Sequence, residues 1–269
     1  MQAALPNLIP SRGSSDSNSP AGEFPKAGEF PKAGEFLKND ARGKLIVALD
    51  VSTAEAARKI VAAVGDSALT YKVGMQLYTA EGPQVVRDLV ASGRRVFLDL
   101  KYHDIPNTVA AAVTEAAKLG VSMLTVHAAG GGKMLRAASD AARAVNPALL
   151  VLAVTVLTSL DQRDIEQVGI QNTVRDEVLL LTRLALANGC QGIVTSAREA
   201  RAVRTELGDD FAIVTPGVRP AGAAHGDQAR VVTPAEAIAA GASYIVVGRP
   251  ITEAEDPAAA ARAILEQMG

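Results

Sequence analysis

From residue 44 onward the sequence repeats one pattern, in which a short run of Val, Ile and Leu is followed by a longer, Ala-rich amphipathic segment. Eight apolar runs occur, and each is long enough for one β-strand: "KLIVALDV", "TYKVGM", "RVFLDL", "MLTVHA", "LLVLAVTVL", "GIVTS", "FAIVTPGV" and "YIVVGR". Runs that are apolar at consecutive positions predict strands that are buried on both faces. Such strands, when helices separate them, are typical of a parallel sheet covered by helices.

The segments between these runs predict the helices. The clearest helices are expected at residues 53–64, 81–92, 108–119 and 173–188, and Gly93, Gly120 and Gly189 mark the ends of three of them. Eight such units within residues 44–269 predict an α/β fold, a closed (β/α)₈ TIM barrel, whose usual length is about 250 residues. The alternative is an open doubly wound sheet. That fold would favour a Gly-rich turn after the first strand, and "LIVALDVSTAEAA" has none.

Residues 1–43 differ in kind from the rest. "SRGSSDSNSP" is polar and Ser-rich, and "AGEFPKAGEFPKAGEFLK" repeats a six-residue unit almost three times. Because Pro and Gly recur and no helix or strand period is present, we expect a disordered or poorly ordered leader. A basic segment followed by an apolar one, the mark of a signal peptide, is missing. The leader is therefore interpreted as a fusion leader or as an unusual natural extension.

Composition excludes several classes of partner. A net charge of −2 and an aromatic content of 3% provide neither the basic surface nor the stacking residues of a nucleic-acid-binding protein. No apolar run approaches the roughly 18 residues of a membrane helix. The single cysteine, Cys190, excludes an internal disulfide and fits a reducing compartment, so we predict a cytoplasmic protein in which Cys190 is buried.

Chemistry in such a barrel occurs at the carboxyl ends of the strands. Polar, Gly or Pro residues follow nearly every predicted strand, and the expected rim consists of Asp50, Lys72, Asp99, Lys101, Asp104, His127, Thr155, Thr158, Pro216, Gly217, Arg219, Gly248 and Arg249. An Asp after a strand is also often a helix N-cap. For Asp50 that reading stays open, although Ser52 and Thr53 compete for the capping position.

The third strand brings charge to the barrel mouth. Residues two apart share a face of a strand, so Asp99 and Lys101 are predicted to point inward. Burial of charge is costly, and replacing a buried ion pair by apolar residues is often neutral or stabilising, so stability alone is a poor reason to keep the pair. Lys72 and Asp104 could complete an alternating array in which each charge keeps its neighbour ionised and a lysine becomes a preorganised cation and proton donor.

The loops after strands seven and eight predict a phosphate site. Barrels commonly bind phosphate there, and "PGVRPAGAAHGDQ" and "VGRPI" are the two loops in this chain. Arg249, with Gly before it and Pro after it, favours phosphate over a surface ion pair. The stretch from Pro220 to Asp227 lacks any helix or strand period and is long enough to act as a lid.

No metal or cofactor motif is evident, so any charge that develops during a reaction would have to be stabilised by fixed protein charges. His103 and Asp104 face opposite ways if the strand continues, which prevents joint chelation. His127 is expected to hydrogen-bond to the charged residues without contacting the substrate itself. His225 is expected to be exposed to solvent.

At these residues the sequence resembles the orotidine 5′-monophosphate decarboxylase family. "LDLKYHDIPNT" carries the D-x-K-x-x-D core followed by I-P-N-T, and "IVALDV", "YKVGMQLY", "LTVHAAGG", "AVTVLTS", "VTPGVRP" and "YIVVGRPI" follow the family pattern in order. The resemblance covers residues 44–269, whereas the leader has no counterpart in it. It implies decarboxylation of orotidine 5′-monophosphate to UMP and CO₂ in pyrimidine biosynthesis, with no metal or cofactor.

The resemblance also implies roles for single residues. Lys101 would stabilise the carbanion and protonate it, Asp99 would face the departing carboxylate, and Lys72 would pair with Asp99 and contact the ribose. Asp104 would reach the neighbouring subunit of a homodimer, together with Ile105 and Thr108. The remaining substrate-binding positions are implied at Asp50 for the ribose, Thr158 near the base, Pro216 at the rim, and Arg219, Gln228, Gly248 and Arg249 for the phosphate.

Two rival functions remain open. One is a sugar-phosphate decarboxylase or aldolase of the same superfamily, which shares D-x-K-x-x-D but uses Mg²⁺. The "DIPNT" continuation and the Gln228 loop favour the nucleotide enzyme. The other is a non-catalytic phosphate-binding barrel that acts as a sensor or scaffold, and the intact charge array argues against it.

Overall fold

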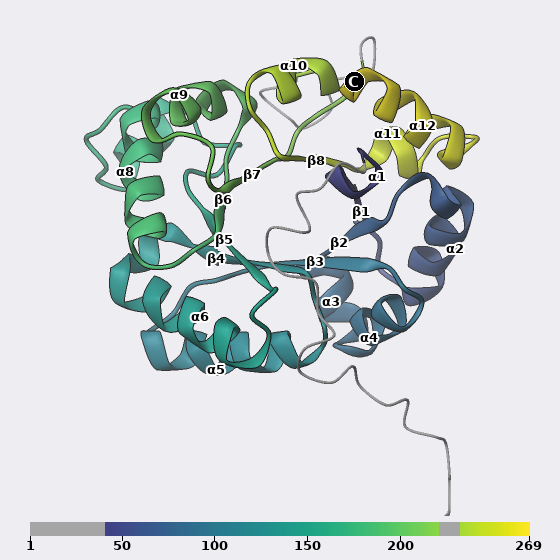
Figure 1. The fold of residues 1–269 in the computed structure, drawn as a ribbon, viewed down its shortest axis with the longest axis horizontal. Helices are drawn as coiled ribbons and strands as arrows, with labels where there is room; N and C mark the ends of the chain where they lie inside the picture. The colour runs from purple at the N-terminus through teal and green to yellow at the C-terminus, as the bar shows by residue number, and fades with distance from the viewer. Residues whose placement is uncertain (1–40, 221–231) are drawn as a thin grey trace, which may run out of the picture.

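A computed structural model describes residues 41–220 and 232–269 of the chain. Eight parallel strands follow one another in chain order around a closed barrel, and β8 pairs with β1 (Figure 1). The strands are β1 (Leu45–Ala48), β2 (Thr70–Gly74), β3 (Arg95–Tyr102), β4 (Met123–His127), β5 (Leu150–Val154), β6 (Gly192–Val194), β7 (Ala212–Thr215) and β8 (Tyr244–Val247). The predicted (β/α)₈ barrel is confirmed.

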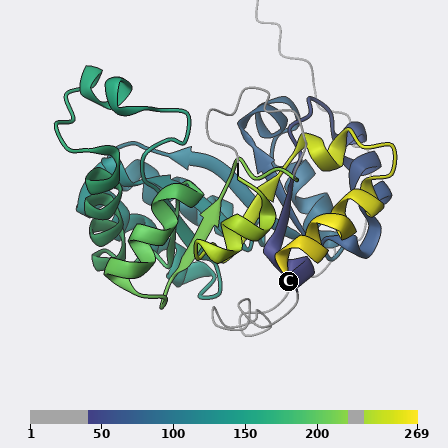
Figure 2. The same ribbon diagram turned by 90° about the horizontal axis from the view of Figure 1, so that it is seen from above.

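Helices form an outer ring around the strands, whereas the short α1 lies inside this ring, next to β1 (Figure 1). The helices are α1 (Ala41–Lys44), α2 (Ala54–Val64), α3 (Met75–Glu81), α4 (Gln84–Ala91), α5 (Pro106–Lys118), α6 (Gly131–Val145), α7 (Gln162–Gln167), α8 (Val174–Ala187), α9 (Ala197–Leu207), α10 (Pro234–Ala239), α11 (Arg249–Thr252) and α12 (Pro257–Met268), with short 3₁₀ turns at Gly65–Ser67 and Ala128–Gly130. The segment that carries α7 projects beyond the ends of the strands (Figure 2, teal). Within residues 41–220 and 232–269, no helix has both the length and the apolar character to cross a membrane.

Two predicted boundaries differ from the structure. Residues 81–92 do not form one helix, because α3 ends at Glu81 and the chain then turns at Gly82, whose φ is 66°, and at Pro83 before α4 begins. Packed structure also begins earlier than residue 44. Gly43 is buried, and its carbonyl accepts a hydrogen bond from the Thr70 hydroxyl at 3.1 Å. The rest of the predicted leader, residues 1–40, lies outside the described residues.

Strand alternation divides the apolar residues into two cores. One lies between the strands and the outer helices and contains residues such as Leu98. The other fills the barrel, and it consists of Ile46, Ala48, Phe97, Met123, Leu150, Leu152, Ala212, Val214, Tyr244 and Val246. Phe97 thus points inward and Leu98 outward, which makes Asp99 the next inward residue of β3, at the mouth of the barrel.

Gly192 of β6 is required by the packing inside the barrel. A Cβ atom at this position would lie 2.4 Å from the Ala212 carbonyl oxygen and 2.9 Å from Leu152 Cδ2. Because a strand carbonyl cannot move aside as a flexible side chain can, we expect Gly192→Ala to lower the free energy of unfolding by about 1–3 kcal/mol, the usual cost of overpacking a core. Urea unfolding measures this change. An unchanged urea midpoint would show that the barrel relaxes at this position without cost.

Candidate active site

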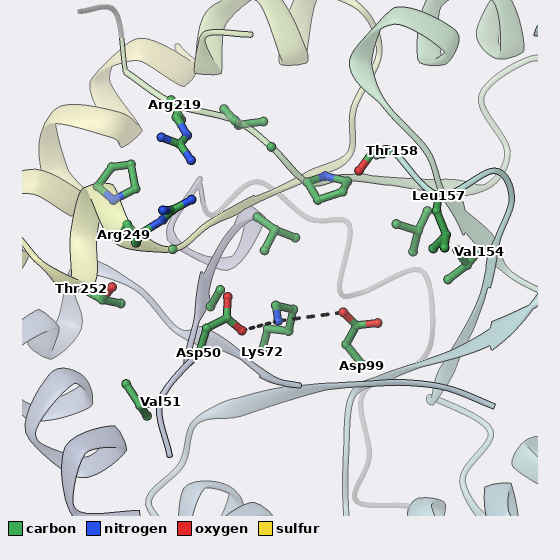
Figure 3. Close-up of a pocket in the computed structure, with 18 of the residues that line it drawn as sticks. Asp50, Val51, Lys72, Asp99, Val154, Leu157, Thr158, Arg219, Arg249 and Thr252 are labelled. Carbon is green, nitrogen blue, oxygen red and sulfur yellow. Dashed lines mark hydrogen bonds and ion pairs between the residues drawn. The ribbon is translucent and has the colours of Figure 1, made fainter. Parts of the chain in front are cut away.

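A cavity of about 520 Å³ lies at the carboxyl ends of the strands. That volume is within the range of small-molecule sites. Figure 3 shows part of its lining, with polar side chains that come from the ends of different strands. Ten of the predicted residues line this cavity, namely Asp50, Lys72, Asp99, Lys101, Thr158, Pro216, Gly217, Arg219, Gly248 and Arg249.

Four charged side chains in the cavity form a continuous ionic array. Lys101 Nζ lies 2.9 Å from Asp99 Oδ1, and Lys72 Nζ lies 3.9 Å from Asp99 Oδ2. Lys72 Nζ also donates to Asp50 Oδ1 at 2.8 Å (Figure 3). The side chains of Lys72 and Asp99 are only 13% and 14% exposed, so their charges interact with little screening by solvent. The array within one chain therefore begins at Asp50 and ends at Lys101, and Asp104 is not part of it.

The position of Asp50 answers the question about its capping role. The N-cap of α2 is Thr53, whose side chain accepts a hydrogen bond from Ala56 N–H. Asp50 instead turns toward Lys72. Gly74 leaves room for this ion pair, because a Cβ atom there would lie 3.0 Å from Lys72 Nζ and 3.5 Å from Asp50 Oδ1.

Lys101 has a left-handed backbone. Its φ of 51° is the only positive value among the described residues other than glycine. For an L-residue this conformation costs about 1–2 kcal/mol. It falls within an irregular stretch of the β3–β4 pairing, where the register shifts between Leu98 and Tyr102. Regular alternation predicted that Asp99 and Lys101 share a face, but the structure brings their side chains together through this irregular backbone.

Two arginines form the other end of the cavity. Arg219 follows β7 and is only 8% exposed, and Arg249 begins α11 after β8. Figure 3 shows both guanidinium groups at the same end of the cavity, away from Asp99. Gly217 adopts a φ of 75° in the loop that leads to Arg219, a conformation that favours glycine. Two guanidinium groups from neighbouring loops suit a phosphate, which accepts paired N–H donors.

An apolar wall completes the cavity and was not predicted from the sequence. It is formed by Val154, Val156, Leu157, Val194 and Val246. These residues lie at or just beyond the ends of β5, β6 and β8, where the sequence shows only the apolar character of a strand. Thr155, which we placed at the rim, is buried instead, and its hydroxyl lies 3.1 Å from the Val194 carbonyl oxygen.

Three predicted residues at the end of β3 and the start of α5 lie outside the cavity. Asp104, Ile105 and Thr108 are exposed on the chain, and Ile105 is 67% exposed despite its apolar side chain. Asp104 Oδ1 accepts a hydrogen bond from Ile105 N–H at 2.6 Å. Gln228, His225 and the predicted lid after Pro220 lie outside the described residues.

The two described histidines stack on each other beside the array. The ring centroids of His103 and His127 are 5.1 Å apart and their planes differ by 17°. Burial, followed by the nearby charges of His103 and Lys101, lowers the pKa of His127. The hydrogen bond found at His127 connects its Nδ1 atom to Ala129 N–H at 3.4 Å, rather than to the charge network.

Cys190 belongs to the core between the strands and the outer helices, where it has a packing role. Its side chain is buried, and burial raises the pKa of the thiol to about 11. At neutral pH such a thiol is protonated and a poor nucleophile. Among the described residues, no group of three or more His, Cys, Asp or Glu side chains is arranged to hold a metal ion.

Fold and cavity together define a TIM-barrel protein with a Lys/Asp array and a pair of arginines at the carboxyl ends of its strands. The sequence profile of the "Orotidine 5'-phosphate decarboxylase / HUMPS family" matches residues 43–264. The chain belongs to this family.

Individual relatives agree with the profile. The chain is 51% identical over 226 residues to an orotidine 5'-phosphate decarboxylase of Idiomarina loihiensis, which covers 84% of this chain and 98% of the relative. It is 52% identical over 238 residues to the protein of the same name from Moorella thermoacetica, covering 86% and 94%. The crystal structure of orotidine 5'-phosphate decarboxylase from Lactobacillus acidophilus superposes with a TM-score of 0.76 at 40% identity, covering 84% of this chain and 98% of that chain.

Proposed function

We propose that this protein decarboxylates orotidine 5′-monophosphate to UMP and CO₂, as a step in pyrimidine nucleotide synthesis, with neither a metal nor a cofactor. The observation that carries the proposal is the ionic array of Asp50, Lys72, Asp99 and Lys101 within one cavity. The names of the relatives support the same activity. The single cysteine supports a cytoplasmic location.

Lys101 is the proposed catalytic acid. As the bond between the ring carbon and the carboxylate breaks, CO₂ leaves and the electron pair stays on the ring carbon. The Lys101 ammonium, held by Asp99 at 2.9 Å, stabilises this developing charge and then donates a proton to the carbon. The neutral amine regains a proton from solvent after product release.

Asp99 and Lys72 fix the charge distribution before substrate binds. Asp99 faces the departing carboxylate, and Lys72 balances the Asp99 charge from the adjacent strand at 3.9 Å. Asp50, held by Lys72 at 2.8 Å and 60% exposed, is free to accept hydrogen bonds from ribose hydroxyls. Preorganised charges of this kind favour the transition state without reorganisation during the reaction.

The phosphate is proposed to bind at the opposite end of the cavity. Arg219 and Arg249 are its side-chain ligands there, with Gln228 and the backbone of Gly248 as further contacts. Thr158 and Pro216 line the part of the cavity that would receive the base, beside the apolar wall of Val154 and Val194. Phosphate binding far from the reacting carbon would supply energy for closing the site and excluding water.

The substrate class is tested with two compounds and one enzyme preparation. We expect orotidine 5′-monophosphate to lose its absorbance and UMP to appear, and we expect no reaction with a pentulose or hexulose phosphate. Turnover of the sugar phosphate alone would favour the related Mg²⁺-dependent enzymes. An absence of turnover with both compounds, together with measurable UMP binding, would favour a non-catalytic phosphate-binding barrel.

We also propose a homodimer in which Asp104 completes the neighbouring site. Asp104 and Thr108 are exposed and lie outside the chain's own cavity, and the large apolar side chain of Ile105 is exposed between them. In such a dimer the Ile105 side chain would be buried against the partner subunit, which removes apolar surface from water. A two-fold dimer would place the same loop of each subunit against its partner.

Mixing two inactive variants tests this arrangement. Lys101→Ala and Asp104→Asn chains are each expected to be inactive as homodimers. In a mixed dimer the site built on the Asp104→Asn chain has its own Lys101 and an intact Asp104 from the partner, so about a quarter of all sites regain activity after random exchange. An unfolding and refolding cycle of the mixture provides the exchange. If Asp104 served its own chain, the mixture would stay inactive.

A further inference from the structure

The irregular pairing between β3 and β4 singles out one residue of β4. Leu98 pairs with Leu124, and Tyr102 pairs with Val126, so three residues of β3 lie opposite one residue of β4. That residue is Thr125. Such a bulge locally disrupts the ladder and leaves backbone groups of the bulged strand without their ladder hydrogen bonds. A side chain on the opposite strand can then supply a hydrogen-bond partner.

The Thr125 hydroxyl is bonded on both sides within this bulge. Its Oγ1 atom accepts a hydrogen bond from Lys101 N–H at 2.9 Å and donates one to Asp99 Oδ1 at 3.0 Å. Asp99 Oδ1 is the same oxygen that accepts from Lys101 Nζ at 2.9 Å. A hydroxyl carries one proton, so donation to Asp99 leaves Oγ1 to accept from the Lys101 backbone. One buried oxygen thus contacts the backbone of Lys101 and the carboxylate of Asp99.

We propose that Thr125 is a positioning residue for the decarboxylation, because its hydroxyl fixes the left-handed backbone of Lys101 and the carboxylate of Asp99 relative to each other. This inference rests on the proposed function of the site. The conformation at Lys101, with φ at 51°, needs a partner that the β3–β4 ladder does not supply. Without the hydroxyl, Lys101 N–H and Asp99 Oδ1 each lose a bond, and the ammonium is free to shift relative to the reacting carbon.

Thr125 is distinct from the residues that touch substrate. It is 0% exposed and is not among the residues that line the cavity. Its effect must therefore pass through Lys101 and Asp99. Because these residues are assigned to the chemical step, a Thr125 variant should lower kcat and leave KM and nucleotide binding nearly unchanged.

The test compares variants that differ in one hydroxyl. Thr125→Val keeps the shape and removes the hydroxyl, whereas Thr125→Ser keeps the hydroxyl. We expect Thr125→Val to lower kcat by about 10- to 100-fold, as small misplacements of catalytic groups do. We expect Thr125→Ser to restore kcat to within about threefold of the wild type, and UMP affinity to change by less than about twofold in either variant.

A matched control uses another buried threonine. Thr182 of α8 is 0% exposed, and its hydroxyl donates a hydrogen bond to the Val178 carbonyl oxygen at 2.7 Å. It is not among the residues that line the cavity. Thr182→Val should leave kcat unchanged. If Thr125→Val fails to fold, Thr125→Ala leaves the same two bonds unmade with a smaller side chain and is measured instead.

The possible outcomes separate this inference from the proposed function. A kcat of Thr125→Val or Thr125→Ala near that of wild type would overturn the role of Thr125. An equal loss in Thr125→Ser, or a loss that appears only in KM, would overturn it as well. A wild-type enzyme that fails to turn over orotidine 5′-monophosphate would instead contradict the proposed function, and the positioning role with it.

Discussion

Replacing Lys101 with alanine is expected to abolish decarboxylation while leaving the binding of nucleotide monophosphates measurable. The variant loses the group that is proposed both to stabilise the carbanion and to protonate it. General acid catalysis alone is worth about 10²- to 10⁴-fold, and loss of a preorganised charge adds to this, so we expect kcat to fall by more than about 10⁴-fold. UMP binding by calorimetry and turnover by absorbance give the two measurements, made on the same preparation.

The control for this variant is a lysine on the outer face of the barrel. Lys118 of α5 is 56% exposed and pairs with Glu115 at 2.7 Å, three positions away on the same helix. Lys118→Ala should retain wild-type turnover. Turnover near wild type in Lys101→Ala would remove Lys101 from the centre of the mechanism, and loss of UMP binding in that variant would show that the site itself had collapsed.

Replacing Arg249 with alanine is expected to act through the phosphate. A hydrogen bond to a charged group contributes about 1.5–3 kcal/mol, so losing paired contacts should lower kcat/KM for the nucleotide by about 100-fold or more. In the proposed binding mode, orotidine without its phosphate has no group that Arg249 contacts. The variant and the wild type should therefore react with orotidine at similar, low rates.

Arg143 provides the matched control for Arg249. It is 57% exposed on α6 and pairs with Asp140 at 3.2 Å. Arg143→Ala should not change kcat/KM for either substrate. If Arg249→Ala lowered activity on orotidine as strongly as on the nucleotide, Arg249 would have a role outside phosphate binding.

The fold could be predicted from the sequence because the same strand–helix pattern occurs eight times. Apolar runs such as "LLVLAVTVL" and "YIVVGR" recur at strand-like lengths between Ala-rich segments, and eight repeats leave few architectures open. The helix ends were harder to place. The break between α3 and α4 depends on Gly82 and Pro83, which are compatible with either a helix end or a loop in isolation.

The charged residues of the site could also be predicted from the sequence. A charge such as Asp99 or Lys101 in an otherwise apolar strand is expensive, so its presence indicates a purpose. The partners that hold these charges are less visible. Thr125 resembles any strand threonine in sequence, and the left-handed φ of Lys101 arises from a bulge that regular alternation does not foresee.

The apolar part of the site and the ion pair between Asp50 and Lys72 required the structure. Val154 and Val194 line the cavity, yet in the sequence they continue strands like any other valine. Asp50 follows β1 in a place where a capping role was equally reasonable, and its 2.8 Å bond to Lys72 depends on the register of β1 with β2. Side chains on adjacent strands meet only when that register is known.

The most direct test of the proposed chemistry is turnover of orotidine 5′-monophosphate by the full chain after treatment with a metal chelator. A mechanism carried by Lys101 and its ionic partners predicts that the chelated enzyme decarboxylates the nucleotide at the untreated rate, and that added Mg²⁺ changes nothing. Loss of turnover on chelation, with recovery on adding Mg²⁺, would contradict it.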